Sequence, residues 1–435
     1  MRDQASQGWR ESLVRSHIAP GAEPANPANV SVRRPSRRKT ASRPYWSSRR
    51  RQAQARRVAT PHRTRGEPVP ARVQEVSFHD IVPKHIQAIA SYKSENPAEE
   101  VERELGVKVV QLGMNENPFG PSPRAVEAVR QYLQKIAPYP DDSGFHLRQK
   151  LAASLKISMD EIIISSGSSD ILAMAYQALR SADTEVLTGE ASFVVYYQLA
   201  EITGMPIVRV PMKDYGFDLE AMAERITPKT RLIILANPNN PTGTIVRQRE
   251  LDRFMKKVPD HALVILDEAY IEYVNDPEYP ESLTYMRAGK SVLILRTFSK
   301  AYGLAGLRIG YGISNREVID TLYKVRMAFN TSSVAQVAAL AAWDDHEHVE
   351  KSVTMNRSEL EFIYRELSER GVKYVPSYAN FLLVDLGRPG REVSSALLQQ
   401  GVIVRPAWGC PNAMRVSVGT REQNEKFLAA LEKVL

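Results

Sequence analysis

Short runs of apolar residues that end abruptly in polar ones recur along the middle of the chain. Residues 231–235, 262–266 and 291–295 read Arg-Leu-Ile-Ile-Leu, Ala-Leu-Val-Ile-Leu and Ser-Val-Leu-Ile-Leu. Strands buried on both faces have such nearly continuous apolar sequences, whereas half-exposed strands alternate. We therefore predict three buried strands in an open, mostly parallel sheet.

Other apolar runs extend this pattern into an α/β fold. Residues 162–164 predict a further strand, and residues 171–176 predict the helix that follows it. Towards the C-terminus, strand-like runs at residues 379–385, 402–404 and 415–418 alternate with helical stretches. Strands that alternate with helices are typical of α/β domains.

The chain has 435 residues, which is too long for one small domain, and its 43% hydrophobic content allows a substantial core. We expect a large domain with a mostly parallel central sheet at residues 118–328 and a smaller α/β domain at residues 329–435. Residues 78–117 are expected to form an N-terminal segment that packs with the smaller domain.

Residues that could bind a cofactor follow the last of the three central runs. Residues 297–308 place a Ser299-Lys300 pair in a glycine-interrupted loop, with Arg308 eight positions after the lysine. Such a lysine suits a covalent bond to the aldehyde of pyridoxal 5'-phosphate, while Ser299 and Arg308 can hold the phosphate. Taken alone, the stretch also fits a solvated lysine in a surface turn.

The other two central runs end in residues that fit the same cofactor. A carboxylate at Asp267, directly after a buried strand, is costly without a partner. The protonated ring nitrogen of pyridoxal phosphate would be that partner. Asn240 and Tyr270 could donate hydrogen bonds to the phenolate oxygen of the cofactor. Ligands collect outside the carboxyl ends of parallel strands, so we predict one site there.

Three motifs together resemble a known family. They are Asn-Pro-Thr-Gly at residues 240–243, Asp-Glu-Ala-Tyr at 267–270 and Ser-Lys-Ala-Tyr-Gly-Leu-Ala-Gly-Leu-Arg at 299–308. In order and spacing they resemble the class I and II aminotransferases, which are pyridoxal-phosphate enzymes of fold type I. Within that family the chain most resembles the histidinol-phosphate aminotransferases, from about residue 78 to residue 435.

This resemblance implies a reaction. We expect reversible transfer of the amino group of L-histidinol phosphate to 2-oxoglutarate, which gives imidazole-acetol phosphate and glutamate in histidine biosynthesis. Lys300 is expected to bind the cofactor and then to move a proton between the substrate Cα and the cofactor.

The resemblance also implies further cofactor contacts. Ser168 and Ser169, at the start of a predicted helix, match residues that hold the cofactor phosphate, although serines there are also ordinary helix caps. Phe193 matches the aromatic residue that stacks on the cofactor ring. Tyr139 matches a tyrosine that reaches the cofactor phosphate of the neighbouring subunit, so we expect a homodimer.

Substrate recognition is expected from two arginines and one tyrosine. Arg415 lies where the family binds the substrate carboxylate, and Arg405 matches the residue placed against the substrate phosphate. Tyr92 matches a substrate-gripping tyrosine, which also crosses to the neighbouring site. This match is looser, because residues 93–97 replace a Pro-Gly-Lys-Pro stretch that often follows the tyrosine.

Three other functions stay open. An aromatic amino-acid aminotransferase, or a lyase similar to threonine-phosphate decarboxylase, would share nearly all of these cofactor residues. A non-enzymatic protein that binds nucleic acid through its basic N-terminal arm is the most remote alternative. Deletion of residues 1–77 would distinguish this nucleic-acid binder from an enzyme.

The first 77 residues differ in composition from the rest. They contain 17 lysines and arginines against 5 aspartates and glutamates, and the remaining residues contain 41 against 45. This basic segment has few apolar clusters, so we expect a disordered extension. It could be a transit peptide, a nucleic-acid arm or a translation start assigned too far upstream, and we favour the last or a dispensable extension.

The remaining composition adds constraints on location and metals. Cys410 is the only cysteine, so no disulfide framework can form, which is typical of a cytoplasmic protein. The eight histidines show no zinc-like spacing, and we expect no metal. The apolar stretch at residues 332–343 is too short to span a bilayer, so we expect no membrane association.

Overall fold

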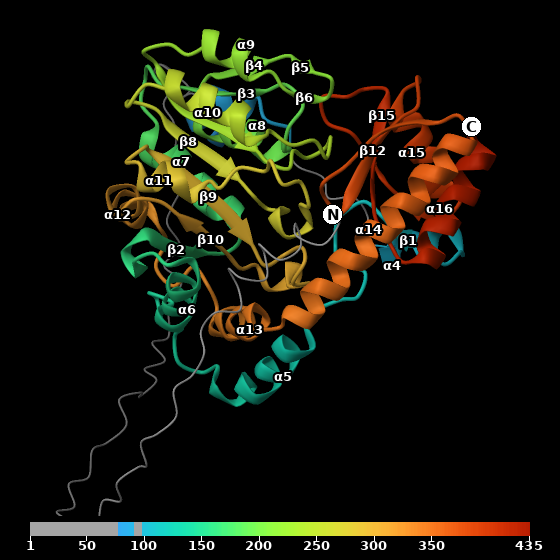
Figure 1. Ribbon diagram of the computed structural model, residues 1–435, viewed down its shortest axis with the longest axis horizontal. Coiled ribbons are helices and arrows are strands. Elements are labelled where there is room, and N and C mark those ends of the chain that lie inside the picture. The colour runs from blue at the N-terminus through green and yellow to red at the C-terminus, as the bar shows by residue number, and fades with distance from the viewer. Residues whose placement is uncertain (1–76, 91–97) are drawn as a thin grey trace, which may run out of the picture. The chain divides into compact units, whose positions relative to one another are not determined.

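The computed structural model describes residues 77–90 and 98–435. The chain divides into two units, Met1–Ile81 and Val82–Leu435. Within the first unit the described part is the short helix α2 (Phe78–Ile81). The expected extension at residues 1–77 and the position of Tyr92 therefore lie outside the described residues, apart from Ser77. The second unit contains both of the larger sheets (Figure 1).

A seven-stranded sheet in the order β2-β10-β9-β8-β7-β3-β4 forms the centre of the second unit. Only β10 runs antiparallel to its neighbours, so the predicted mostly parallel sheet is confirmed. Its strands are β2 (Ile162–Ser165), β3 (Glu185–Gly189), β4 (Ile207–Val210), β7 (Thr230–Ala236), β8 (Leu263–Asp267), β9 (Val292–Thr297) and β10 (Gly310–Ile313).

Hydrophobic cores cover both faces of this sheet. Side chains of a strand alternate between faces, and in β7 Ile233 and Leu235 belong to one core while Leu232 and Ile234 belong to the other. The second core also takes residues from α7 (Ser168–Leu179), α8 (Val194–Thr203) and α12 (Arg316–Val325). The first core is completed by α5 (Pro123–Tyr132), α6 (Phe145–Leu155), α9 (Leu219–Glu224), α10 (Gln248–Lys257), α11 (Leu283–Arg287) and α13 (Ser333–Trp343).

A four-stranded antiparallel sheet in the order β11-β12-β15-β14 forms the C-terminal part, drawn in orange and red in Figure 1. Its strands are β11 (Lys373–Val375), β12 (Phe381–Asp385), β14 (Arg405–Pro406) and β15 (Ala413–Ser417). Apolar residues of this sheet pack against α14 (His346–Glu369), α15 (Gly390–Gln399) and α16 (Arg421–Val434).

The N-terminal segment reaches this C-terminal part through a short strand. β1 (Val110–Gln111) pairs in parallel with β13 (Val402–Ile403), and Leu112 joins the C-terminal core. The proposed domain boundaries at residues 117 and 328 stay predictions, and α13, beyond the second boundary, packs against α5 and α6 of the large sheet. The remaining described helices and strands are α3 (Lys84–Gln87), α4 (Ala98–Leu105), β5 (Met212–Lys213) and β6 (Gly216–Phe217), with 3-10 turns η1 (Leu133–Lys135), η2 (Met159–Glu161), η3 (Ile271–Tyr273) and η4 (Ala305–Leu307).

No helix within residues 77–90 and 98–435 is long and apolar enough to cross a bilayer. Within the same residues, no group of three or more histidine, cysteine, aspartate or glutamate side chains is arranged to hold a metal ion.

Gly303, in the loop after β9 that contains Lys300, lies close to the backbone of Gly120. Gly303 has a φ of +71°, and a Cβ added there would lie 2.0 Å from the carbonyl oxygen of Gly120. We expect Gly303→Ala to lower the free energy of unfolding by about 1–2 kcal/mol for the left-handed backbone and by about 1–3 kcal/mol more for the clash. Thermal denaturation of the cofactor-free protein measures this loss.

Gly289 provides the control for that prediction. Its φ is +77°, but a Cβ there would meet no atom within 4 Å. Gly289→Ala should therefore show only the backbone part of the destabilisation. Equal losses in the two variants would show that the contact between Gly303 and Gly120 does not restrict the fold.

Candidate active site

Three parallel strands of the central sheet end side by side and carry the predicted chemistry. In the sheet register, Ala236 of β7 lies opposite Asp267 of β8, which in turn lies opposite Leu295 of β9. The polar loops that follow these strands therefore begin at the same edge of the sheet. The three strands predicted from the apolar runs are confirmed, and their order β7-β8-β9 follows the chain.

Lys300 lies in the loop after β9 with its amine against the N-terminal segment. Its Nζ donates a hydrogen bond of 3.2 Å to the carbonyl oxygen of Met114 and lies 5.7 Å from the centre of the Tyr270 ring. Burial among protein atoms lowers the pKa of Lys300 to about 7, and the positive charge of Arg415 acts in the same direction. A large fraction of this amine is neutral at pH 7.

Asp267 is a buried carboxylate at the end of β8. Its Oδ2 accepts a hydrogen bond of 2.7 Å from the hydroxyl of Tyr196, and its Oδ1 accepts one of 3.2 Å from the backbone N–H of Ala269. Burial raises the pKa of Asp267 to about 6, although both hydrogen bonds oppose this rise. The positive charge of Lys300 is the weakest of the effects that act on it.

Tyr270 and Asn240 lie together beside Asp267. The Tyr270 hydroxyl oxygen accepts hydrogen bonds from Asn240 Nδ2 at 3.4 Å and from Asn115 Nδ2 at 3.1 Å. The amide oxygen of Asn240, Oδ1, accepts a hydrogen bond of 2.8 Å from Nη1 of Arg415. Asn240 and Tyr270, which were predicted to act together, are therefore in direct contact. Asn240 also contacts Arg415, which was predicted to bind substrate.

Ser168, Ser299 and Arg308 converge near the start of α7. The helix begins at Ser168 after Gly167, whose φ of +86° turns the chain out of β2. Arg308 Nη1 lies 3.5 Å from Ser299 Oγ, and its Nη2 is 2.8 Å from the position of a Cβ on Gly167. The first N–H groups of a helix have no partner within the helix, so this corner combines a guanidinium, hydroxyls and backbone donors for an anion. Ser169 is the next residue of the same helix turn.

The two predicted substrate arginines are cross-strand neighbours. Arg405 of β14 lies directly opposite Arg415 of β15, so both side chains leave the same face of the C-terminal sheet. Arg415 Nη2 donates a hydrogen bond to the carbonyl oxygen of Gly113, and Arg405 Nη2 lies 3.0 Å from the sulfur of Met114.

Phe193 and Tyr139 lie in different surroundings. Phe193 precedes α8, and its ring meets that of Tyr196 edge to face with centroids 5.6 Å apart. Tyr139 is 82% exposed and stacks on Phe329 with centroids 4.9 Å apart. The structure therefore leaves Tyr139 on the surface of this subunit.

Several residues of the site were not predicted from the sequence. Tyr196 could have been found, because it lies in the first turn of α8, three positions after Phe193, the residue that precedes the helix. No comparable signal marks the N-terminal segment, where Asn115 has a φ of +56° and hydrogen-bonds Ser417 as well as Tyr270. Asn117 likewise donates to the backbone oxygen of Ala301, next to the predicted lysine.

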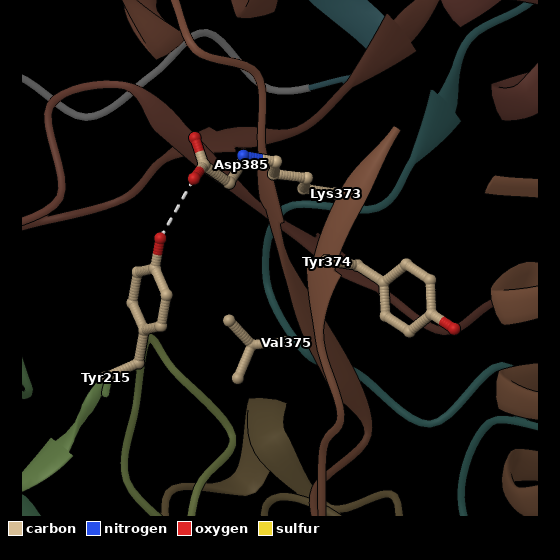
Figure 2. A pocket seen from close by; sticks show the side chains of 5 residues that line it. All are labelled: Tyr215, Lys373, Tyr374, Val375 and Asp385. Atoms are coloured by element: carbon tan, nitrogen blue, oxygen red, sulfur yellow. Dashed lines mark hydrogen bonds between the residues drawn. The ribbon is translucent and has the colours of Figure 1, made fainter. Parts of the chain in front are cut away.

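A separate pocket lies at the opposite end of β12 from this site (Figure 2). Phe381, at one end of the strand, touches the Tyr270 ring, whereas Asp385 ends the strand and accepts a 2.9 Å hydrogen bond from Tyr215. No residue predicted for the site is among the residues that line the pocket, which are Tyr215, Lys373, Tyr374, Val375 and Asp385.

Sequence comparisons place the chain among known enzymes. The family model of aminotransferase class I and II matches residues 107–431. The chain is 47% identical over 361 residues to the histidinol-phosphate aminotransferase of Moorella thermoacetica, a match that covers 81% of this chain and 94% of the relative. Histidinol-phosphate aminotransferase 1 of Nitrosococcus oceani is 43% identical over 364 residues, with 83% and 98% covered.

Solved structures agree with the sequence comparisons. The histidinol-phosphate aminotransferase of Sinorhizobium meliloti in complex with pyridoxal-5'-phosphate superposes with a TM-score of 0.76 at 29% identity, with 81% of this chain and 97% of the other covered. A double mutant of Thermus thermophilus aspartate aminotransferase gives a TM-score of 0.72 at 25% identity, with 81% and 99% covered. The chain therefore belongs to the class I and II aminotransferases and is a pyridoxal 5'-phosphate-dependent transaminase of fold type I.

Proposed function

We propose that the enzyme transfers the amino group of L-histidinol phosphate to 2-oxoglutarate and catalyses the reverse reaction as well. The observation that carries this proposal is the pair Arg405 and Arg415, which lie on one face of β14 and β15 close to the segment that contacts Lys300. Such a pair suits a donor with a phosphate group and an acceptor with carboxylates. The names of the relatives in Moorella and Nitrosococcus support the same donor.

The residues around Lys300 fit pyridoxal 5'-phosphate. The buried carboxylate of Asp267, which accepts a hydrogen bond from Tyr196, suits the protonated ring nitrogen. Asn240 and Tyr270, which are hydrogen-bonded to each other, are proposed to contact the phenolic oxygen, and Phe193 is proposed to stack on the ring. We assign the phosphate to the corner at the start of α7, formed by Ser168, Ser169, Ser299 and Arg308.

Lys300 has two tasks in this proposal. Its neutral amine would hold the cofactor through the aldehyde carbon, with release of water, until a substrate amine takes its place. The released amine then takes the proton from the substrate Cα and delivers it to the cofactor C4' atom. When bound, pyridoxal phosphate supplies an electron sink for the Cα–H bond that breaks. A pKa of about 7 suits a group that must both accept and donate this proton.

The arginines and the surrounding segment orient the substrate. Arg415, held by Asn240 and the Gly113 carbonyl, is proposed to bind the carboxylate of glutamate or 2-oxoglutarate. Arg405 is proposed to bind the phosphate of histidinol phosphate, and Tyr92 to contact the substrate. Two anionic substrates would then use the same arginines in turn.

We further propose that the active unit is a homodimer. Tyr139, 82% exposed, lies in a surface region with Met327 at 77% and Phe329 at 46% exposure. Exposed apolar side chains that gather in this way are typical of interfaces. In the dimer, Tyr139 would reach the cofactor phosphate of the partner subunit.

We also propose a cytoplasmic location, since Cys410 is the only cysteine, and cell fractionation tests it.

The identity of the donor gives the first prediction. The cofactor-loaded enzyme is mixed in single turnover with L-histidinol phosphate, L-phenylalanine or L-threonine O-phosphate, without any keto acid. We expect only histidinol phosphate to convert the lysine-bound cofactor rapidly to its amine form, measured by absorbance. Conversion by phenylalanine would instead indicate an aromatic aminotransferase, and carbon dioxide release from threonine O-phosphate would indicate a lyase.

Arg405→Ala serves as the matched variant in that experiment. It should slow the conversion by histidinol phosphate by roughly 10²-fold, because a charge-assisted contact to the phosphate is lost. If Arg405→Ala left the rate with histidinol phosphate unchanged, the proposed phosphate contact would be wrong.

The lowered pKa of Lys300 predicts how the cofactor-free enzyme captures pyridoxal phosphate. Only the neutral amine reacts, and its fraction rises with pH until the pKa is passed. We expect the rate of covalent attachment to rise about tenfold per pH unit below pH 7 and to level off above about 7. Stopped-flow absorbance measures this rate. A rate that continued to rise to pH 9 would indicate an ordinary lysine, and Lys300→Ala should show no covalent attachment while still binding the cofactor.

The dimer proposal predicts restored activity in mixed dimers. Lys300→Ala and Tyr139→Ala subunits are each expected to be impaired, but their mixed dimer contains one site with both residues intact. Random mixing makes half of the dimers mixed, so about one quarter of wild-type activity should return. A mixture of Lys300→Ala with Asp267→Ala is the control, because both residues belong to the same subunit's site and no intact site can form.

A further inference from the structure

A tyrosine outside the three strand ends makes the shortest contact with Asp267. Tyr196 is completely buried in α8, and its hydroxyl donates to Asp267 Oδ2 at 2.7 Å. A tyrosine hydroxyl has a single proton to donate, so this contact uses its whole donor capacity. The family resemblance assigned no role to this residue.

The direction of this hydrogen bond is determined by its surroundings. Burial, and next to it the negative charge of Asp267, raise the pKa of Tyr196 well above its ordinary value of 10. The hydroxyl therefore stays protonated and donates, and the carboxylate accepts. A hydrogen bond to a charged acceptor is stronger than one between neutral groups and favours the ionised form of Asp267.

Tyr196 is itself held in place. Its backbone oxygen accepts a 2.7 Å hydrogen bond from the hydroxyl of Tyr176 in α7. Its ring packs edge to face on Phe193, and its side chain belongs to the core that lies between α7, α8 and the sheet. With Tyr196 on Oδ2 and Ala269 on Oδ1, both oxygens of Asp267 are tied, so the plane of the carboxylate is fixed.

We propose that Tyr196 is a positioning residue that keeps Asp267 ionised and oriented towards the cofactor ring nitrogen, and thereby keeps the ring proton on nitrogen. The inference rests on the proposed role of Asp267. Without the Tyr196 proton, the carboxylate becomes more basic, and the proton shared between the ring nitrogen and Asp267 moves towards Asp267. Atoms and charge balance, because one proton changes place within the pair.

The test uses the full chain with Tyr196→Phe, loaded with pyridoxal phosphate labelled with nitrogen-15 in the ring. The chemical shift of this nitrogen reports whether it carries the proton. We expect the equilibrium between protonated ring nitrogen and protonated Asp267 to move towards Asp267 by roughly tenfold to a hundredfold, the range for a lost hydrogen bond to a charged group. The dissociation constant of the cofactor should rise as well.

Tyr176→Phe is the matched control. It removes another buried tyrosine hydroxyl from the neighbouring helix, but that hydroxyl donates to the backbone oxygen of Tyr196 and not to Asp267. Both variants should lose some thermal stability, whereas only Tyr196→Phe should move the nitrogen signal. An unchanged signal in Tyr196→Phe, or an equal change in both variants, would overturn the proposal and leave Tyr196 a core residue.

The measurement needs no substrate. It therefore gives the same answer whether the amino donor is histidinol phosphate or another amine. A wrong donor assignment would appear in the single-turnover experiment with the three amines, while a wrong role for Tyr196 would appear only in the nitrogen signal.

Discussion

Burying the carboxylate of Asp267 at the end of β8 costs free energy, and the groups around it reduce that cost. A hydroxyl from α8 and a backbone N–H take one oxygen each. The register of the parallel strands then places the ends of β7 and β9 on either side, so Asn240 and Lys300 follow from the position of Asp267. The protonated ring nitrogen of the cofactor, in the contact we propose, would offset more of this cost.

The segment at residues 113–117 connects the two sheets at the site. Gly113 and Met114 contact Arg415 and Lys300 through backbone oxygens, and Asn115 contacts both Tyr270 and Ser417. Lys300 and Tyr270 belong to loops of the central sheet, whereas Arg415 and Ser417 belong to the C-terminal one. The groups proposed to bind the cofactor and those proposed to bind the substrate are therefore held together by a piece of chain from neither sheet.

Strands and local motifs could be predicted from the sequence because their signals are local. Residues 231–235, 262–266 and 291–295 are apolar on both faces, and the structure places them as adjacent parallel strands. The role of Tyr196 depends on the packing of α8 against β8, and the role of Asn115 on a contact across about 300 residues to Ser417. Such long-range contacts follow from tertiary packing and leave no periodic pattern in the chain.

The pairing of Arg405 with Arg415 has a consequence for how this enzyme could change in evolution. Side chains alternate along a strand, so a shift of one residue turns every side chain to the opposite face. The turn between the two strands is closed by Ala407, Cys410 and Ala413, whose backbones hydrogen-bond in succession. One inserted or deleted residue in that turn would redirect one arginine away from the other. With the substrate roles proposed for these arginines, substrate choice would depend on the length of this turn, and an insertion there would change the anion recognised while leaving the cofactor chemistry intact.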